Sequence, residues 1–145
     1  MNEPRQTHQF DFWLGSWKVF DPDGRLVGTN RISALFGGRA LMEEWEGNGA
    51  VSGRSLNAWD AGRGAWHQTW MDSSGSTLLL DGGLSDGSMV MEGEAPSGSD
   101  GQTWDRHRIT WTPSSDGAEV RQLWETSTDG GSGWTVAFDG RYRRA

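Results

Sequence analysis

Large apolar and polar side chains alternate along most of this chain, in short segments that end at turn residues. In one such segment Trp66, Gln68 and Trp70 fall on one side and His67 and Thr69 on the other, the period of a half-buried β-strand. Asp-Gly and Gly-Gly pairs recur between the segments, which is typical of an antiparallel meander. The pattern predicts about ten strands, at residues 15–20, 25–34, 39–46, 53–59, 64–71, 76–81, 88–94, 103–112, 118–126 and 133–142.

A meander of this length predicts a closed sheet. An open sheet of about ten twisted strands would leave two unpaired edges, and closure into a barrel removes both. Only the stretch His8–Leu14 favours a helical turn. We therefore predict an all-β fold, a single antiparallel meander closed into a roughly ten-stranded barrel with a short N-terminal helical turn. It forms one domain over residues 1–145, with a flexible N-terminus at 1–8 and a mobile polar loop at 95–102.

The alternation also assigns side chains to the two faces of the sheet. We take the tryptophan-bearing face of each strand as the inner one, since residues two apart point the same way. Aromatic walls with a few directed polar groups are typical of a small-molecule site, and barrels of this size enclose ligands. A solid core in which amides satisfy the indole N–H groups is the alternative. The predicted ligand-binding residues are Trp45, Asn57, Trp66, Gln68, Trp70, His107, Trp111, Gln122 and Trp124.

Composition and charge narrow the choice of partners. Ten tryptophans and 22 glycines among 145 residues fit an aromatic interior between tight turns. The formal net charge of −7 argues against nucleic acid, which is held by clustered Lys and Arg. No apolar run is long enough to predict a membrane span, and the N-terminal residues lack the apolar centre of a secretory signal, so we expect a cytoplasmic protein. The absence of cysteine excludes disulfides and thiolate chemistry.

Few residues offer catalytic or metal chemistry. His107 is the only histidine predicted to face inward, and with Glu43 it could form a general base and its orienting group. A two-histidine metal site would need His67 on the same face as His107, but the alternation places His67 on the outer face. No metalloprotease, serine-hydrolase or nucleotide-binding motif occurs, and we expect neither a metal nor a cofactor. Haem held by His107 is a rival reading.

Three segments carry a family resemblance. Phe10–Trp17 reads F-D-F-W-L-G-S-W, in which Gly15-Ser16-Trp17 matches the G-x-W that opens the first strand of lipocalin-like barrels. Together with Trp66–Asp72 and Ser127–Trp134, this pattern resembles a widespread bacterial family of uncharacterised, lipocalin-like proteins over about residues 10–143. The resemblance implies a calycin-type β-barrel with an internal cavity, and it brings no catalytic residues.

In lipocalins an arginine from a late strand stacks across the tryptophan of the G-x-W motif and plugs the closed end of the barrel. The resemblance therefore implies that Arg141 and Arg143, on the last predicted strand, cover Trp17 in this way. The segment Ser127–Trp134 also resembles an Asp-box hairpin, S-x-D-x-G-x-T-W with Gly133 in place of threonine. A single copy indicates a turn device in which Asp and Gly supply the turn geometry.

These observations favour binding of a small, largely apolar or aromatic molecule inside a lipocalin-like barrel. A cofactor-independent isomerase, cyclase or hydrolase that uses His107 and Glu43 is the first alternative. A haem-binding barrel, or an interaction module without a ligand, is the second, and exposed aromatics such as Trp104 would mark the latter. The oligomeric state stays open, with a homodimer as one option.

Overall fold

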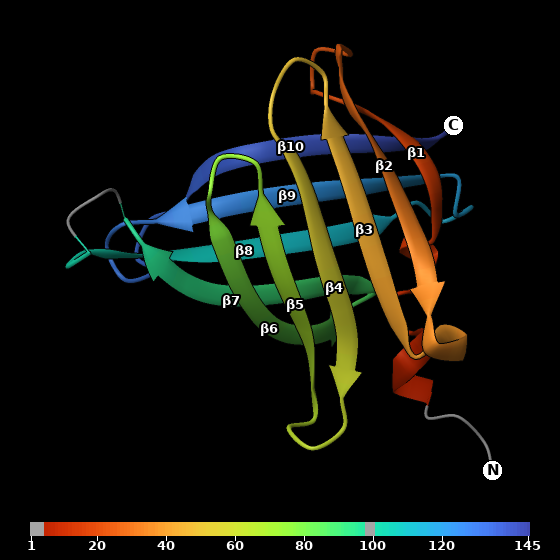
Figure 1. Ribbon diagram of the computed structural model, residues 1–145, viewed down its shortest axis with the longest axis horizontal. Helices are drawn as coiled ribbons and strands as arrows, with labels where there is room; N and C mark the ends of the chain where they lie inside the picture. The colour runs from red at the N-terminus through yellow and green to blue at the C-terminus, as the bar shows by residue number, and fades with distance from the viewer. Residues whose placement is uncertain (1–4, 98–100) are drawn as a thin grey trace.

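The computed structural model describes residues 5–97 and 101–145, and these residues form a closed antiparallel β-barrel (Figure 1). The predicted fold class is confirmed. Each strand pairs with its neighbours in sequence, and β1 pairs with β10 to close the barrel. The strands are β1 (Gly15–Phe20), β2 (Leu26–Leu35), β3 (Ala40–Gly47), β4 (Ser52–Asp60), β5 (Ala65–Asp72), β6 (Thr77–Ser85), β7 (Ser88–Pro96), β8 (Trp104–Pro113), β9 (Glu119–Ser127) and β10 (Thr135–Arg144).

Within the described residues, three 3-10 helices accompany the strands: η1 (Arg5–His8), η2 (Asp11–Trp13) and η3 (Phe36–Gly38). The helical turn expected near the N-terminus is η2, whereas η3, between β2 and β3, has no counterpart in the prediction. The flexible segment expected at 1–8 and the mobile loop expected at 95–102 fall partly on residues 1–4 and 98–100, which lie outside the described residues. Within 5–97 and 101–145, no helix is long and apolar enough to cross a membrane.

The Asp-Gly and Gly-Gly pairs predict turns at both Asp81-Gly82-Gly83 and Asp86-Gly87, and the first of these is wrong. Asp81-Gly82-Gly83 lies inside β6, where a side chain at Gly82 would overlap the backbone carbonyl of Val90 on β7. Gly82 therefore permits a close approach of two strands. The chain reverses at Asp86 and Gly87, as predicted, and both residues have a positive φ, of 50° and 82°. Two central residues with φ above zero are the mark of a type I′ hairpin turn.

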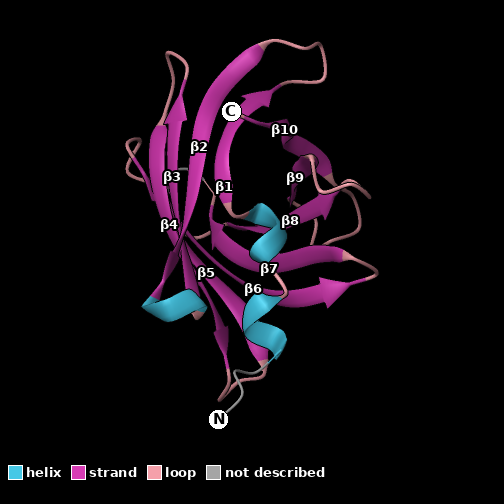
Figure 2. Cartoon of the chain, turned by 90° about the vertical axis from the view of Figure 1, so that its right-hand side faces the viewer, coloured by secondary structure: helices cyan, strands magenta, loops and turns pink. Residues whose placement is uncertain are grey.

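The N-terminal segment plugs one end of the barrel, where η1 and η2 lie in Figure 2. Phe10 stacks on Trp13 with ring centroids 4.7 Å apart, and it meets Trp66 of β5 and Trp111 of β8 edge-on at 5.7 and 5.1 Å. All four side chains are fully buried. Much of the F-D-F-W motif is thus explained by the packing of this closed end.

An arginine seals the closed end from outside, but it is Arg144 instead of Arg141 or Arg143. Arg144 pairs with Trp17 in the β1–β10 register, and its guanidinium lies 3.9 Å from the centre of the indole. It also donates hydrogen bonds to the carbonyls of Leu14 and Gly117, at 2.6 and 3.2 Å. Residues two apart on a strand share a face, so Arg141 and Arg143 point outward, opposite to Arg144.

The Asp-box-like segment is a turn device between β9 and β10, as predicted. Ser127 donates a hydrogen bond to Asp129 at 2.8 Å, and Asp129 accepts the backbone N–H of Gly133 at 2.8 Å. Trp134 stacks against the guanidinium of Arg108, 4.0 Å from its ring centre. These contacts stiffen the loop at the end of the barrel opposite the N-terminal plug.

Candidate functional site

A cavity of about 620 Å³ occupies the half of the barrel away from the plug. Its volume lies in the range of small-molecule sites, roughly 300–1,000 Å³. The mouth is framed by the β3–β4 loop with Val51, the β5–β6 loop with Ser74, and the end of β7 at Pro96. The barrel is therefore open at one end and plugged at the other.

Aromatic side chains form one wall of the cavity. Trp124 and Phe138 are paired in the β9–β10 register, and Phe138 meets Trp45 edge-on with ring centroids 5.8 Å apart. Trp70 continues the wall on β5, and its indole N–H donates to Asp72 at 3.0 Å. Four aromatic rings from four strands thus surround the same space.

Glycines on adjacent strands let these rings lie flat against the sheet. A Cβ atom at Gly28 would stand 2.5 Å from Cη2 of Trp45, and one at Gly53 would overlap the ring of Trp70. Both glycines sit within strands, on β2 and β4. Because the rings occupy the space that side chains would fill there, the centre of the barrel stays open.

Polar side chains form the floor of the cavity, and they are linked in one chain of hydrogen bonds. The amide of Gln68 donates to Asn57 at 2.8 Å, Asn57 donates to Ser55 at 2.8 Å, and Ser55 donates to Oε1 of Glu43 at 2.7 Å. Asn30 donates to Oε2 of Glu43 at 2.7 Å. The floor therefore holds a carboxyl group with a donor on each oxygen.

Tyr142 extends the floor towards β9. Its hydroxyl accepts a hydrogen bond from Asn30 at 2.8 Å and donates one to Gln122 at 2.5 Å. Burial, followed by the nearby charge of Glu43, raises the pKa of Tyr142 well above its ordinary value. Burial also raises the pKa of Glu43, and the hydrogen bonds from Asn30 and Ser55 offset this only in part.

His107 stands near the mouth, where its Nδ1 accepts the indole N–H of Trp124 at 3.0 Å. An indole N–H can only donate, so Nδ1 carries no proton and the ring is neutral with its proton on Nε2. Burial lowers the pKa of His107, against the opposing charge of Asp105. The imidazole is therefore a neutral member of the wall.

The structure brings six of the nine predicted ligand-binding residues to the cavity and places three elsewhere. Trp66 and Trp111 belong to the plug, and Asn57 lies behind Gln68 in the hydrogen-bond chain. The predicted residues that do line the cavity are Trp45, Gln68, Trp70, His107, Gln122 and Trp124. Glu43, named in the prediction only as a catalytic candidate, lines it too.

Sequence reasoning missed Asp72, Leu78, Ile109, Phe138 and Tyr142 as lining residues. The alternation carried a signal for Ile109 and Asp72, since Ile109 shares a face with His107 and Asp72 shares one with Trp70. Leu78 is opposite Trp70 only in the β5–β6 register, which the sequence does not give. Phe138 was hidden by a register shift between Val136 and Phe138, because such a bulge breaks the alternation.

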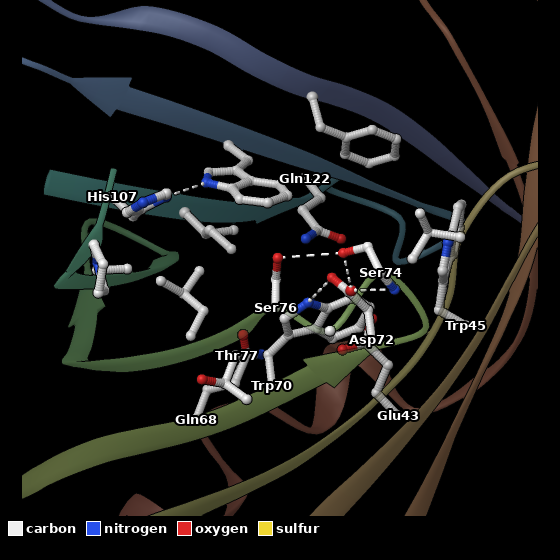
Figure 3. Close-up of a pocket in the computed structure, with 18 of the residues that line it drawn as sticks. Glu43, Trp45, Gln68, Trp70, Asp72, Ser74, Ser76, Thr77, His107 and Gln122 are labelled. Carbon is white, nitrogen blue, oxygen red and sulfur yellow. Dashed lines mark hydrogen bonds between the residues drawn. The ribbon is translucent and has the colours of Figure 1, made fainter. Parts of the chain in front are cut away.

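The two predicted catalytic groups do not meet. Figure 3 shows Glu43 and His107 on opposite sides of the pocket, and no hydrogen bond joins them in the described part of the chain. Each is bound instead to its own neighbours. Glu43 and His107 therefore do not form a general base with its orienting group.

The surroundings of His107 do not fit a haem ligand. A metal-ligating histidine donates its second ring N–H to a partner, which leaves the other nitrogen free for the metal. Nδ1 of His107 accepts a hydrogen bond from Trp124 instead, so Nε2 carries the proton. Within residues 5–97 and 101–145, no group of three His, Cys, Asp or Glu side chains could hold a metal ion.

The assignment of the fold and of the candidate site therefore rests on the structure of this chain. The closed antiparallel barrel of ten strands is compatible with the lipocalin-like fold. Neither the family models nor the curated proteins with which the chain was compared gave a match.

Proposed function

We propose that this protein binds a small molecule with a largely apolar or aromatic body inside its barrel, in the manner of lipocalin-like proteins. The observation that carries the proposal is the cavity of about 620 Å³, open at one end, with aromatic walls and a polar floor. Burial of the ligand against Trp45, Trp70 and Trp124 would supply affinity, and Gln68 and Gln122 would orient it.

Filling the cavity tests the proposal. Leu78 lines the cavity and is 5% exposed, whereas its neighbour Leu79 points outward and is 55% exposed. We expect the neutral dye N-phenyl-1-naphthylamine to fluoresce more strongly with the wild type and to quench tryptophan emission. Leu78→Trp should weaken dye binding at least tenfold, because the added ring occupies the site, and the control Leu79→Trp should bind as the wild type does.

Two results of the dye titration would count against the proposal. Equal dye binding by wild type and Leu78→Trp would overturn the proposal, because the dye would then lie outside the barrel. Absence of any binding would favour the interaction-module alternative. Trp104, which is 54% exposed at the start of β8, would then be the first residue to substitute.

A further inference from the structure

The floor of the cavity holds a carboxyl group that lacks a positive partner. Glu43 is 4% exposed, and no ion pair in the described part of the chain involves it. Buried carboxylates in proteins are usually paired with a cation or coordinate one. Here the groups around Glu43, namely Asn30, Ser55 and Tyr142, are all uncharged in the neutral pH range.

The hydrogen bonds around Glu43 are directed towards it. The side-chain amide of Asn57 donates to the Ser55 oxygen, which leaves the hydroxyl proton of Ser55 free to point at Glu43. Gln68 donates into the same chain from further along the floor. Since Asn30 and Ser55 can each donate to one carboxyl oxygen, the site can hold the ionised form of Glu43 once a cation lies beside it.

The rest of the cavity suits a cation as well. Among the described residues, no lysine or arginine lines it, and the second carboxyl group in its lining is that of Asp72 at the mouth (Figure 3). Burial raises the pKa of Asp72, but hydrogen bonds from Ser74 and Trp70 outweigh this effect and lower it, so Asp72 is ionised at neutral pH. A negative mouth attracts cations from solution.

The aromatic walls lie beside the carboxyl group. Trp45 is two residues from Glu43 on the inner face of β3. Trp70 lies two strands away in the same row, because Ser55 pairs with both Glu43 and Trp70. An ammonium group between indole faces and a carboxylate is stabilised by both, and loss of water strengthens the attraction to each.

We infer that the ligand is an organic amine bound as its ammonium ion, whose charged nitrogen reaches Glu43 while its apolar or aromatic body lies along Trp45, Trp70 and Trp124. This inference rests on the proposed function and specifies the chemical class of the ligand. An anionic ligand is disfavoured by the two carboxyl groups, and a neutral one would leave Glu43 without a positive partner.

Three probes of the same shape test the inference by isothermal titration calorimetry at pH 7.5. They are 4-phenylbutylamine, 4-phenylbutan-1-ol and 4-phenylbutanoate, which present a cation, a neutral hydroxyl and an anion on one body. We expect the amine to bind at least tenfold more tightly than the alcohol and the acid to bind most weakly. This comparison of probes uses the wild-type protein alone and needs no variant.

A matched pair of variants locates the effect. Glu43→Gln should lower the affinity for the amine to that for the alcohol, and its retained binding of the alcohol shows that the cavity is intact. Glu44→Gln removes the same charge from the outer face of β3, outside the cavity lining, and should keep the preference for the amine.

Each result has one meaning. Equal or tighter binding of the alcohol by the wild type overturns the inference while the binding function stands. A preference for the amine that survives Glu43→Gln also overturns it. If none of the probes binds at millimolar concentration and the neutral dye does not bind, the proposed function fails together with the inference.

Discussion

At the scale of single residues, Glu43 is where burial and hydrogen bonding oppose each other. Burial raises its pKa from the ordinary value of 4.5, and the donors Asn30 and Ser55 offset this in part. The folded protein therefore holds the Glu43 proton more tightly than the unfolded chain does. The contribution of this residue to the free energy of unfolding is full below about pH 4.5 and is lost as pH rises through the folded-state pKa.

Glu43→Gln should make this loss visible. Gln cannot ionise, so the stability of the variant relative to the wild type should increase between pH 4 and pH 8. Inside the window between the ordinary and the raised pKa, the difference should grow by about 1.4 kcal/mol for each pH unit. Urea unfolding across this pH range measures it. The comparison at pH 4 is the control, and parallel profiles for the two proteins would show that Glu43 gains no proton affinity on folding.

At the scale of the strands, the cavity depends on glycines that face aromatic rings from the next strand. Gly53 on β4 leaves room for the ring of Trp70, and its backbone φ is not positive, so alanine is excluded there by the ring and not by the backbone. Overpacking of this kind costs about 1–3 kcal/mol.

Gly53→Ala should displace the indole of Trp70 into the cavity and weaken its hydrogen bond to Asp72. We expect the free energy of unfolding to fall by about 1–3 kcal/mol and dye affinity to fall several-fold. Guanidinium unfolding and the dye titration measure the two effects. Gly83→Ala on β6 is the control, because a Cβ atom there meets nothing within 4 Å. Similar losses in both variants would mean that the strand itself, and not the ring, requires glycine.

The strands also show what alternation can predict and what it cannot. It assigned Trp66, Gln68 and Trp70 to the inner face, and Trp66 and Gln68 are fully buried there. Alternation gives no height along the barrel axis, so Trp66 was grouped with Trp70 although one is in the plug and the other in the cavity wall. Height depends on the length and tilt of all ten strands together.

Alternation was limited in a similar way in predicting the polar residues of the cavity floor. The inner-face pattern found Gln68 and Gln122, but Asn30 and Tyr142 belong to the floor through a hydrogen bond between residues 112 apart in sequence. Such long-range pairs follow from closure of β1 on β10, and no local pattern contains them. The arginine at the closed end was missed for the same reason, because only the β1–β10 register pairs Arg144 with Trp17.

At the scale of the whole molecule, the barrel is held closed by a short seam between the two ends of the chain. β1 and β10 pair through four residues each, whereas β7 and β8 pair through eight. Arg144 reinforces this seam, since it covers Trp17 and binds the carbonyls of Leu14 and Gly117. One planar group thus ties β10 to the entry of β1 and to the β8–β9 turn.

Arg144→Ala should therefore weaken the barrel at its seam. We expect a loss of about 1–2 kcal/mol in the free energy of unfolding, from the charge-assisted hydrogen bonds and the stacking together. Backbone amides of β1 and β10 should exchange with solvent faster than those of β7 and β8. Arg144→Lys should recover only part of the loss, because an ammonium group cannot stack flat and reach both carbonyls. Arg141→Ala, which removes an outward arginine 3.8 Å from Asp139, is the control and should change stability by less than about 0.5 kcal/mol. Equal stability of the two alanine variants would show that the seam holds without Arg144.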